Sequence, residues 1–125
     1  MTATLNGLQV LVVDDEIPVL LMIEDMLTSL GCDVVYSATR VAEALDFLKT
    51  TLPQAAVLDI NVAGVSVYPV ATELAARNVP FVFSSGYGLE GISQEWRSRP
   101  VLHKPYLIDE LARTLGNVVD SSRTA

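Results

Sequence analysis

The chain has 125 residues, which fits one folded domain and is too short for two of ordinary size. Half of the residues are hydrophobic, so a core can form, but no apolar stretch is long enough to span a bilayer and the first residues do not form a secretory signal. The formal net charge of −7 argues against nucleic acid as a partner, and the single Cys32 is consistent with a reducing compartment. We therefore expect a cytoplasmic protein that binds neither membranes nor nucleic acids.

Short apolar runs alternate with patterns of helical periodicity along the chain. In chain order, these patterns predict strand 9–13, helix 20–30, strand 33–36, helix 39–48, strand 55–58, helix 68–77, strand 80–83, strand 100–102 and helix 106–118. Gly31 is a typical residue after the end of a helix, and Thr39 predicts the N-cap of the next one. A polar tail, 120–125, is expected after the last helix.

Strands that alternate with helices predict a parallel sheet, because right-handed crossovers place helices on both of its faces. We expect a flavodoxin-like, doubly wound α/β fold with five strands in the order 2-1-3-4-5. Before the last strand, Gly86, Gly88 and Gly91 predict that the fourth helix is short or disordered. Their G-x-G-x-x-G spacing does not indicate a dinucleotide site, because that motif follows the first strand of its unit. We expect one domain over 1–125, with its core at about 8–118 and no output domain.

Polar and charged side chains follow four of the predicted strands. They are Asp14 and Asp15 after the first strand, Asp59 after the third, Ser84 and Ser85 after the fourth, and Lys104 after the fifth. The carboxyl ends of parallel strands form the ligand-binding edge of such a sheet, so these side chains should converge there. Three neighbouring carboxylates repel unless a cation lies among them, and oxygen ligands suit Mg²⁺, with Mn²⁺ as the alternative. The pattern therefore predicts metal-assisted phosphoryl transfer to a carboxylate.

Each piece of this pattern has an ordinary structural explanation when it is taken alone. An Asp-Asp pair or a single Asp after a strand is commonly part of a turn or a helix cap. A Lys-Pro dipeptide before a helix carries even less information. The joint placement of these residues at four strand ends favours the functional interpretation, because turn chemistry would have to reproduce that order by chance.

Three segments resemble the receiver domains of two-component response regulators. They are Leu-Val-Val-Asp-Asp-Glu at 11–16, Val-Leu-Asp-Ile-Asn at 57–61 and Leu-His-Lys-Pro-Tyr at 102–106. The resemblance extends over about 8–118, and the combination of segments is specific although each one alone is not. It implies a phosphorylation switch in phosphorelay signal transduction.

Carried over residue by residue, the resemblance implies that Asp59 is the phosphoacceptor. Asp14 and Asp15 would hold Mg²⁺ together with Asp59 and the backbone carbonyl of Asn61. Lys104 would bind a phosphoryl oxygen as a point charge. The implied donor is a sensor histidine kinase or a histidine-phosphotransfer protein, with a downstream protein as target, and the chain itself is expected to be a monomer or a weak homodimer.

The segment 80–87, Pro-Phe-Val-Phe-Ser-Ser-Gly-Tyr, resembles the Pro-Phe-x-Phe-Ala-Thr-Gly-Tyr motif of the receiver subfamily nicknamed FAT GUY. On this alignment Ser85 is the switch hydroxyl and Ser84 is not. The amide of Gly86 would then also face the phosphoryl group.

Ordinary receivers carry an aromatic switch residue on the fifth strand, three positions before the lysine, and this position is Val101 here. We therefore expect no coupling through such an aromatic side chain. Tyr87 is the candidate to replace it, either by moving with the Ser85 loop or by shielding the phosphoryl group from water. The alternative is a surface tyrosine in a mobile loop.

The first predicted helix carries a second apolar face beside the one expected to face the core. Val19, Met22 and Met26 lie on it at spacings of three and four residues. In the receiver family this part of the helix docks on the phosphodonor, and an adaptable methionine surface suits such a role. The alternative is additional burial in the core.

The leading interpretation is a phosphoacceptor response regulator, enzymatic only in promoting its own phosphorylation and hydrolysis. One alternative is a Mg²⁺-dependent phosphatase with an aspartyl nucleophile. Members of that family carry an Asp-x-Asp motif after the first strand, and here Glu16 stands two positions after Asp14. The other alternative is an inactive receiver-like binding module, which the complete set of acidic, hydroxyl and lysine residues argues against.

Overall fold

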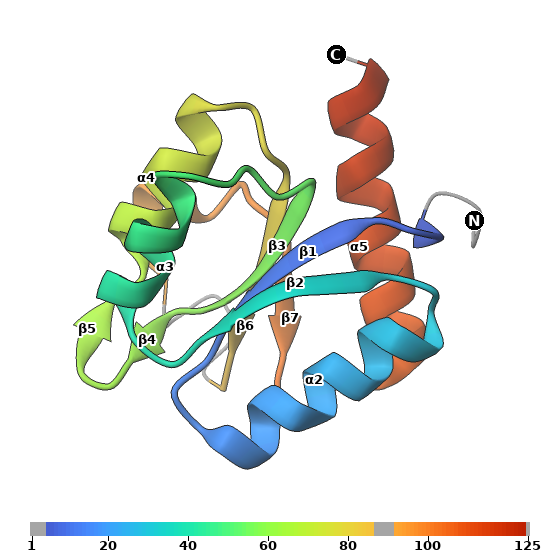
Figure 1. Cartoon of the computed structure of the whole chain (residues 1–125), viewed down its shortest axis with the longest axis horizontal. Helices are drawn as coiled ribbons and strands as arrows, with labels where there is room; N and C mark the ends of the chain where they lie inside the picture. Colours follow the sequence, from blue (N-terminus) through green and yellow to red (C-terminus); the bar gives the residue numbers. More distant parts are fainter. Residues whose placement is uncertain (1–4, 87–91, 125) are drawn as a thin grey trace.

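The computed structural model describes residues 5–86 and 92–124, and its centre is a five-stranded sheet (Figure 1). The strands are β1 (Gln9–Val13), β2 (Asp33–Ala38), β3 (Ala55–Asp59), β6 (Phe81–Ser85) and β7 (Val101–His103). Their order in the sheet is β2-β1-β3-β6-β7, and all neighbouring pairs are parallel. The predicted doubly wound α/β fold with strand order 2-1-3-4-5 is therefore confirmed.

Helices cover both faces of this sheet. Their bounds are α2 (Ile17–Ser29), α3 (Val41–Leu48), α4 (Tyr68–Ala76) and α5 (Ile108–Thr124). The helices α2 and α5 pack on one face, and α3 and α4 pack on the other (Figure 1). Within the two described ranges, no helix is both long and apolar enough to cross a membrane.

The alternation of side chains along each strand divides the core between the two faces. In β1, Val10 and Val12 belong to the cluster under α2 and α5, whereas Leu11 and Val13 belong to the cluster under α3 and α4. All four side chains are almost completely buried. A continuous apolar run is therefore what this central strand requires, because neither of its faces meets water.

Several helix ends differ from the expectations. Gly31 follows the C-cap of α2 with a φ of +89°, as predicted for the residue that ends this helix. Thr39 is not the N-cap of α3; Arg40 is, and the Glu43 carboxylate instead accepts hydrogen bonds from the backbone and the hydroxyl of Thr39. The expected polar tail also differs, because α5 continues to Thr124.

A short hairpin, β4 (Asn61–Val62) with β5 (Val65–Ser66), follows β3 and was not predicted. Its two turn residues, Ala63 and Gly64, both have positive φ, at 54° and 81°. Such a turn normally carries asparagine or aspartate followed by glycine, so an alanine in the first position hides it from sequence patterns. The hairpin lies at the edge of the sheet toward which the strands point (Figure 1).

The connection between β6 and β7 is described only in part, at Gly86 and over 92–100. Residues 87–91 lie outside the described part of the chain, and the helical element described over 92–99 is a 3-10 turn, η2 (Gln94–Trp96). The prediction of a short fourth helix therefore holds over 92–99.

Candidate functional site

Three aspartates meet at the carboxyl edge of the sheet. The parallel register pairs Val13 with Leu58, so Asp14, which follows β1, comes beside Asp59 at the end of β3. Oxygen atoms of Asp14, Asp15 and Asp59 lie within 4.8 Å of one another. The predicted convergence of these carboxylates is therefore present.

Lys104 contacts two of the three carboxylates. Its Nζ donates a hydrogen bond to Oδ2 of Asp14 at 3.0 Å and lies 3.4 Å from Oδ1 of Asp59. The backbone N–H of Lys104 donates to the carbonyl of Ser85 at 2.8 Å, which extends the β6–β7 pairing to the site. Strands β1, β3, β6 and β7 thus each place one element of the site through their hydrogen-bond register.

The charges of the site act strongly on one another because the side chains are poorly hydrated. Burial and the neighbouring charges of Asp14 and Asp15 raise the pKa of Asp59 to about 6, against the attraction of Lys104, which lowers it. Burial lowers the pKa of Lys104, but its hydrogen bond to Asp14 and the charges of both aspartates outweigh this and raise it overall. Lys104 therefore stays protonated at neutral pH, and a further cation beside Asp59 would favour the ionised form of its carboxyl group.

The donor set fits a hard divalent cation. The site offers closely spaced carboxylate oxygens, and Mg²⁺ or Mn²⁺ prefers such ligands. Asp14 is fully buried, and its Oδ1 accepts a hydrogen bond from the backbone of Glu16 at 2.9 Å, so the position of this carboxylate is fixed by the fold. Asp14, Asp15 and Asp59 are the residues that would hold the ion.

Addition of Mg²⁺ to metal-free protein is expected to stabilise the fold. A ligand at a hundred times its dissociation constant adds about 2.7 kcal/mol to the free energy of unfolding. Urea unfolding at neutral pH with a chelator and then with saturating Mg²⁺ measures this difference. Asp15→Asn should lose most of it, whereas Asp46→Asn, at a side chain that is 81% exposed on α3, should keep it. An equal response of the two variants would contradict the proposed ligand set.

Asp59 also borders a pocket of about 440 Å³. The pocket is lined by Asp59, Ile60, Asn61, Gly64, Ser66, Tyr68, Ser85, Gly86 and Ser93. Asp59 is the residue that the acidic cluster and this pocket share. The hairpin β4–β5 and Tyr68 form one wall of the pocket, and the end of β6 forms another, so an added group on Asp59 would meet both walls.

The two serines at the end of β6 point to opposite faces of the strand, as adjacent residues do. Ser85 lines the pocket beside Asp59, and Gly86 follows it there. Ser84 is fully buried, and neither its hydroxyl nor that of Tyr106 forms a hydrogen bond of ordinary geometry within the described residues. Burial raises the pKa of Tyr106 to about 12, so this phenol stays protonated. Ser85 and Gly86 therefore line the pocket that Asp59 borders, and Ser84 is not among its lining residues.

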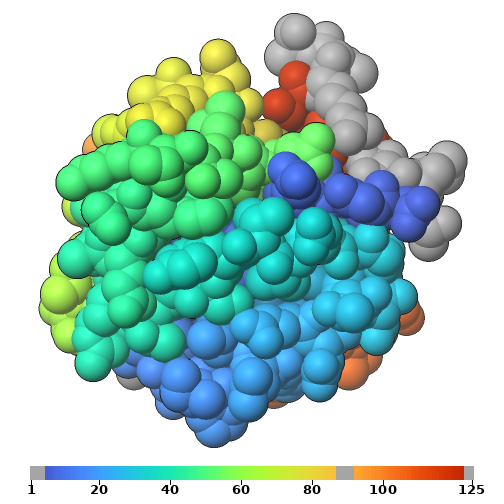
Figure 2. All heavy atoms as spheres, viewed as in Figure 1, coloured from blue at the N-terminus to red at the C-terminus, as the bar shows by residue number. Residues whose placement is uncertain are grey.

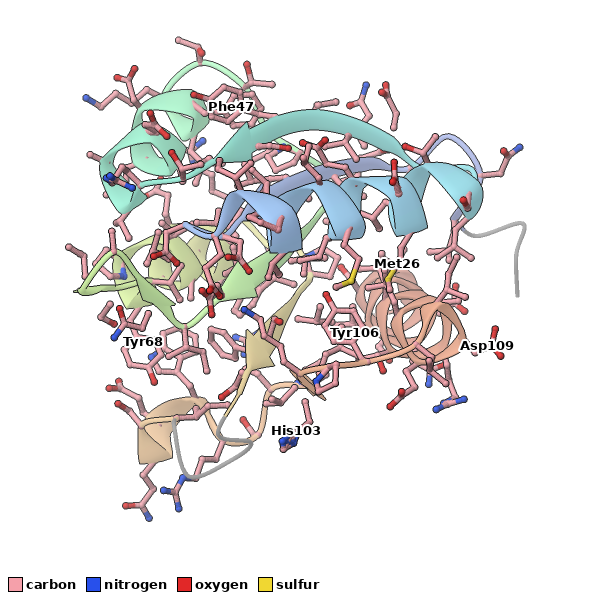
Figure 3. The ribbon with its side chains drawn as sticks, turned by 90° about the horizontal axis from the view of Figure 1, so that it is seen from below. Met26, Phe47, Tyr68, His103, Tyr106 and Asp109 are labelled. Carbon is pink, nitrogen blue, oxygen red and sulfur yellow. The ribbon has the colours of Figure 1, made fainter. Side chains whose placement is uncertain are left out.

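Two other predicted site residues have different outcomes. Tyr87 lies outside the described residues. Asn61 begins β4, at the pocket, and its side-chain Oδ1 accepts a hydrogen bond from the backbone of Gly64 at 2.9 Å. His103, beside Lys104, is exposed, and its side chain lies at the surface of the molecule (Figure 3).

The second apolar face of α2 is only partly free. Val19 and Met26 pack against the core cluster under α2 and α5, and Met26 points toward α5 (Figure 3). Met22 is 39% exposed. Ile17 and Leu21, which the pattern did not single out, are 51% and 53% exposed and add to the exposed apolar surface of α2. The helix forms the lower surface of the molecule in the view of Figure 2.

No family model matches the chain, and no curated protein matches it either. Solved structures do match. The solution structure of SdrG from Sphingomonas melonis Fr1 has a TM-score of 0.82 and 38% identity, over 90% of this chain and 97% of that one. The BeF3-activated conformation of SdrG from Pseudomonas melonis Fr1 has a TM-score of 0.78 and the same 38% identity, over 90% and 98%.

A third structure, of a response regulator receiver protein from Sinorhizobium medicae WSM419, has a TM-score of 0.80 and 26% identity, over 94% of this chain and 98% of that one. The fold of this chain thus recurs in signalling receivers. The chain belongs to the response-regulator receiver domains, a family of phosphorylation-dependent signalling proteins.

Proposed function

We propose that the chain is a phosphoacceptor switch that takes a phosphoryl group from a phosphohistidine donor onto Asp59 with the help of Mg²⁺. The observation that carries the proposal is the position of Lys104, whose Nζ lies 3.0 Å from Asp14 and 3.4 Å from Asp59. A cation there can bind a phosphoryl oxygen while Asp59 attacks phosphorus. The acidic trio supplies the second requirement, a site for a divalent ion.

In the proposed reaction an oxygen of the Asp59 carboxylate forms a bond to phosphorus as the phosphorus–nitrogen bond of the donor breaks. The imidazole leaves with the electron pair of that bond. Asp59 must be ionised to attack, and with a pKa of about 6 it is mostly ionised at neutral pH. Bound Mg²⁺ would neutralise charge on the phosphoryl oxygens. Ser85 and the amide of Gly86, which line the pocket beside Asp59, are proposed to receive the remaining oxygens.

The proposal includes the finer assignment to the FAT GUY subfamily. It is supported by the segment 80–87 and by the placement of Ser85, rather than Ser84, in the pocket. The chain would be enzymatic only toward itself, by promoting its own phosphorylation and dephosphorylation.

The test is incubation with acetyl phosphate and Mg²⁺, followed by intact-mass measurement. Wild type should gain the mass of one phosphoryl group, and Asp59→Asn should gain none. Asp46→Asn, which changes an exposed aspartate, should behave like wild type. An adduct on Asp59→Asn would refute the assignment of the phosphoacceptor, and turnover of added phosphate esters would favour an aspartyl phosphatase.

The exposed apolar surface of α2 is the proposed contact with the donor protein. Replacing Met22 with glutamate should slow phosphoryl transfer from a histidine-phosphotransfer donor, because a charge replaces an apolar contact, while phosphorylation by acetyl phosphate should be unchanged. Leu52→Glu is the matched control, since Leu52 is 49% exposed and lies before β3, at the other end of the sheet. Stopped-flow or gel-based transfer assays measure both rates, and an equal loss of both rates in Met22→Glu would contradict docking.

A further inference from the structure

A phosphorylation switch must transmit a change at Asp59 to the surface of the domain. Ordinary receivers use an aromatic residue on the last strand for this, and Val101 stands at that position here. Val101 is the register partner of Phe83 and packs against the same core cluster. The structure offers a different group of aromatic rings beside Phe83. The inference that follows rests on the proposed function, because it concerns how a phosphoryl group in the pocket beside Asp59 changes the surface of the domain.

One face of β6 connects the pocket to these rings. Phe81, Phe83 and Ser85 alternate along the strand and therefore point to the same side of the sheet. Phe81 and Phe83 are fully buried, with ring centroids 5.3 Å apart. A displacement of the end of β6 toward a phosphoryl group on Asp59 would move Phe83 together with Ser85, because two residues of one strand cannot shift independently.

Tyr68, the first residue of α4, lies beside Phe83, so this movement would act on it. Its ring meets the edge of Phe83 at 6.0 Å and stacks on Trp96 at 5.9 Å with an interplanar angle of 16°. Its hydroxyl accepts a hydrogen bond from the backbone N–H of Ser93 at 2.8 Å. Tyr68 also lines the pocket that contains Asp59 and Ser85. Figure 3 shows Tyr68 between the hairpin β4–β5 and the 3-10 turn.

The contacts of Tyr68 hold a segment that has little other secondary structure. Over 92–99, which contains only a 3-10 turn, Trp96 packs against the edges of Phe81 and Phe83 at 6.1 and 6.0 Å. The guanidinium of Arg99 lies over Phe81 at 4.9 Å and over Trp96 at 5.7 Å. The segment is thus fixed to the sheet by Ile92, which is buried in the core cluster under α3 and α4, and by these aromatic contacts, each of which is a weak interaction by itself.

We propose that Tyr68 is the coupling residue of this switch. Tyr68 lines the pocket that Asp59 borders, and it also contacts Ser93 and Trp96. Occupancy of the pocket therefore changes the position of the segment 92–99. The exposed surface of this segment, at residues 93–95, 97 and 98, is the part of the molecule whose position the phosphoryl group controls. Tyr68 acts as a positioning residue. It responds to occupancy of the pocket through its contact with Phe83 and its place in the pocket wall, and it takes no part in the transfer.

The experiment uses the single tryptophan of the chain, Trp96, as its reporter. Saturating beryllofluoride and Mg²⁺ imitate the phosphorylated state, and isothermal titration calorimetry measures their binding independently of fluorescence. In wild type the fluorescence of Trp96 and the hydrogen exchange of the Ser93 amide should both change on binding. Failure to bind at all would refute the proposed function, whereas binding without either change would overturn the coupling alone.

Two variants and one control complete the test. Tyr68→Phe keeps the ring and removes the acceptor of the Ser93 amide, which should speed its exchange in the free protein by roughly two- to tenfold, the usual worth of one hydrogen bond. The ligand-induced change at Trp96 should shrink in Tyr68→Phe and be lost in Tyr68→Ala. Tyr36→Phe makes the same chemical change at a tyrosine that stacks on Phe47 and belongs to β2, the edge strand opposite β7, and it should respond like wild type.

All variants are compared at saturation, so a smaller change at Trp96 reports coupling and not occupancy. Should Tyr68→Ala fold too poorly, Tyr68→Phe alone decides the question. A full response of Trp96 and Ser93 in ligand-saturated Tyr68→Phe would overturn the proposal.

Discussion

Replacing Lys104 with methionine is expected to lower the free energy of unfolding of the metal-free protein by about 3 kcal/mol, because it leaves a buried carboxylate without its partner. Asp14 is fully buried, and Lys104, with 19% of its side chain exposed, is the cation that the structure places beside it. The loss is not offset elsewhere, since Asp59, 3.4 Å from Nζ, loses the same attraction. Phosphorylation by acetyl phosphate should also slow by roughly 10- to 100-fold, the worth of one charge-assisted contact.

Urea unfolding in the presence of a chelator measures the first effect, and intact mass against time measures the second. Lys49→Met is the matched control, because Lys49 forms an exposed pair with Asp46 at 3.7 Å. A pair of this kind is worth less than about 1 kcal/mol. If Lys104→Met were as stable as Lys49→Met, the interaction of Lys104 with Asp14 would not be a net contribution to the fold.

Asp59→Asn is expected to stabilise the metal-free protein at pH 8 while it abolishes phosphorylation. The pKa of Asp59 is raised to about 6 from an ordinary 3.8, so the folded protein holds this proton more tightly than the unfolded chain does. Well below pH 4 Asp59 is protonated in both states and does not lower the free energy of unfolding. Its ionisation lowers that free energy progressively between pH 4 and 6, and by about 3 kcal/mol above that range. The asparagine side chain of the variant carries no such charge, so the advantage of the variant should grow over the same pH window.

This pH dependence is measured by urea unfolding of wild type and variant at a series of pH values, with a chelator present. Asp46→Asn, at an exposed position, should show no pH-dependent advantage. Saturating Mg²⁺ should shrink the difference between wild type and Asp59→Asn, because the cation neutralises the charge whose burial is costly. Equal stabilities of wild type and Asp59→Asn at pH 8 without metal would show that the Asp59 carboxylate is better solvated than its surroundings imply.

The sheet and the main site could be predicted because both depend on strong local signals. A continuous apolar run that ends in aspartates predicts a buried strand with carboxylates at its end, and β1 has that form. Once the strand order was fixed, the meeting of Asp14 with Asp59 and Lys104 followed from the rule that parallel strands share one carboxyl edge. No other information was required.

The residues that were missed depend on contacts between distant segments. Tyr68 appeared only as the start of a helix, because nothing in its neighbourhood indicates that its hydroxyl meets Ser93 and its ring meets Trp96. The hairpin after β3 was missed because Ala63 occupies a turn position that usually carries asparagine or aspartate. For the apolar face of α2 the sequence left donor docking and core burial open, since helical spacing cannot tell that Met26 packs against the core cluster under α2 and α5.

The central claim is that phosphorus becomes attached to the carboxylate of Asp59. Reduction of the phosphorylated protein with borohydride converts an aspartyl phosphate into homoserine, which peptide mass spectrometry locates to a single residue. The account predicts homoserine at position 59, formed only when Mg²⁺ was present during phosphorylation. Homoserine at Asp14 or Asp15, or a phosphoryl group found on His103 with position 59 unchanged, would contradict it.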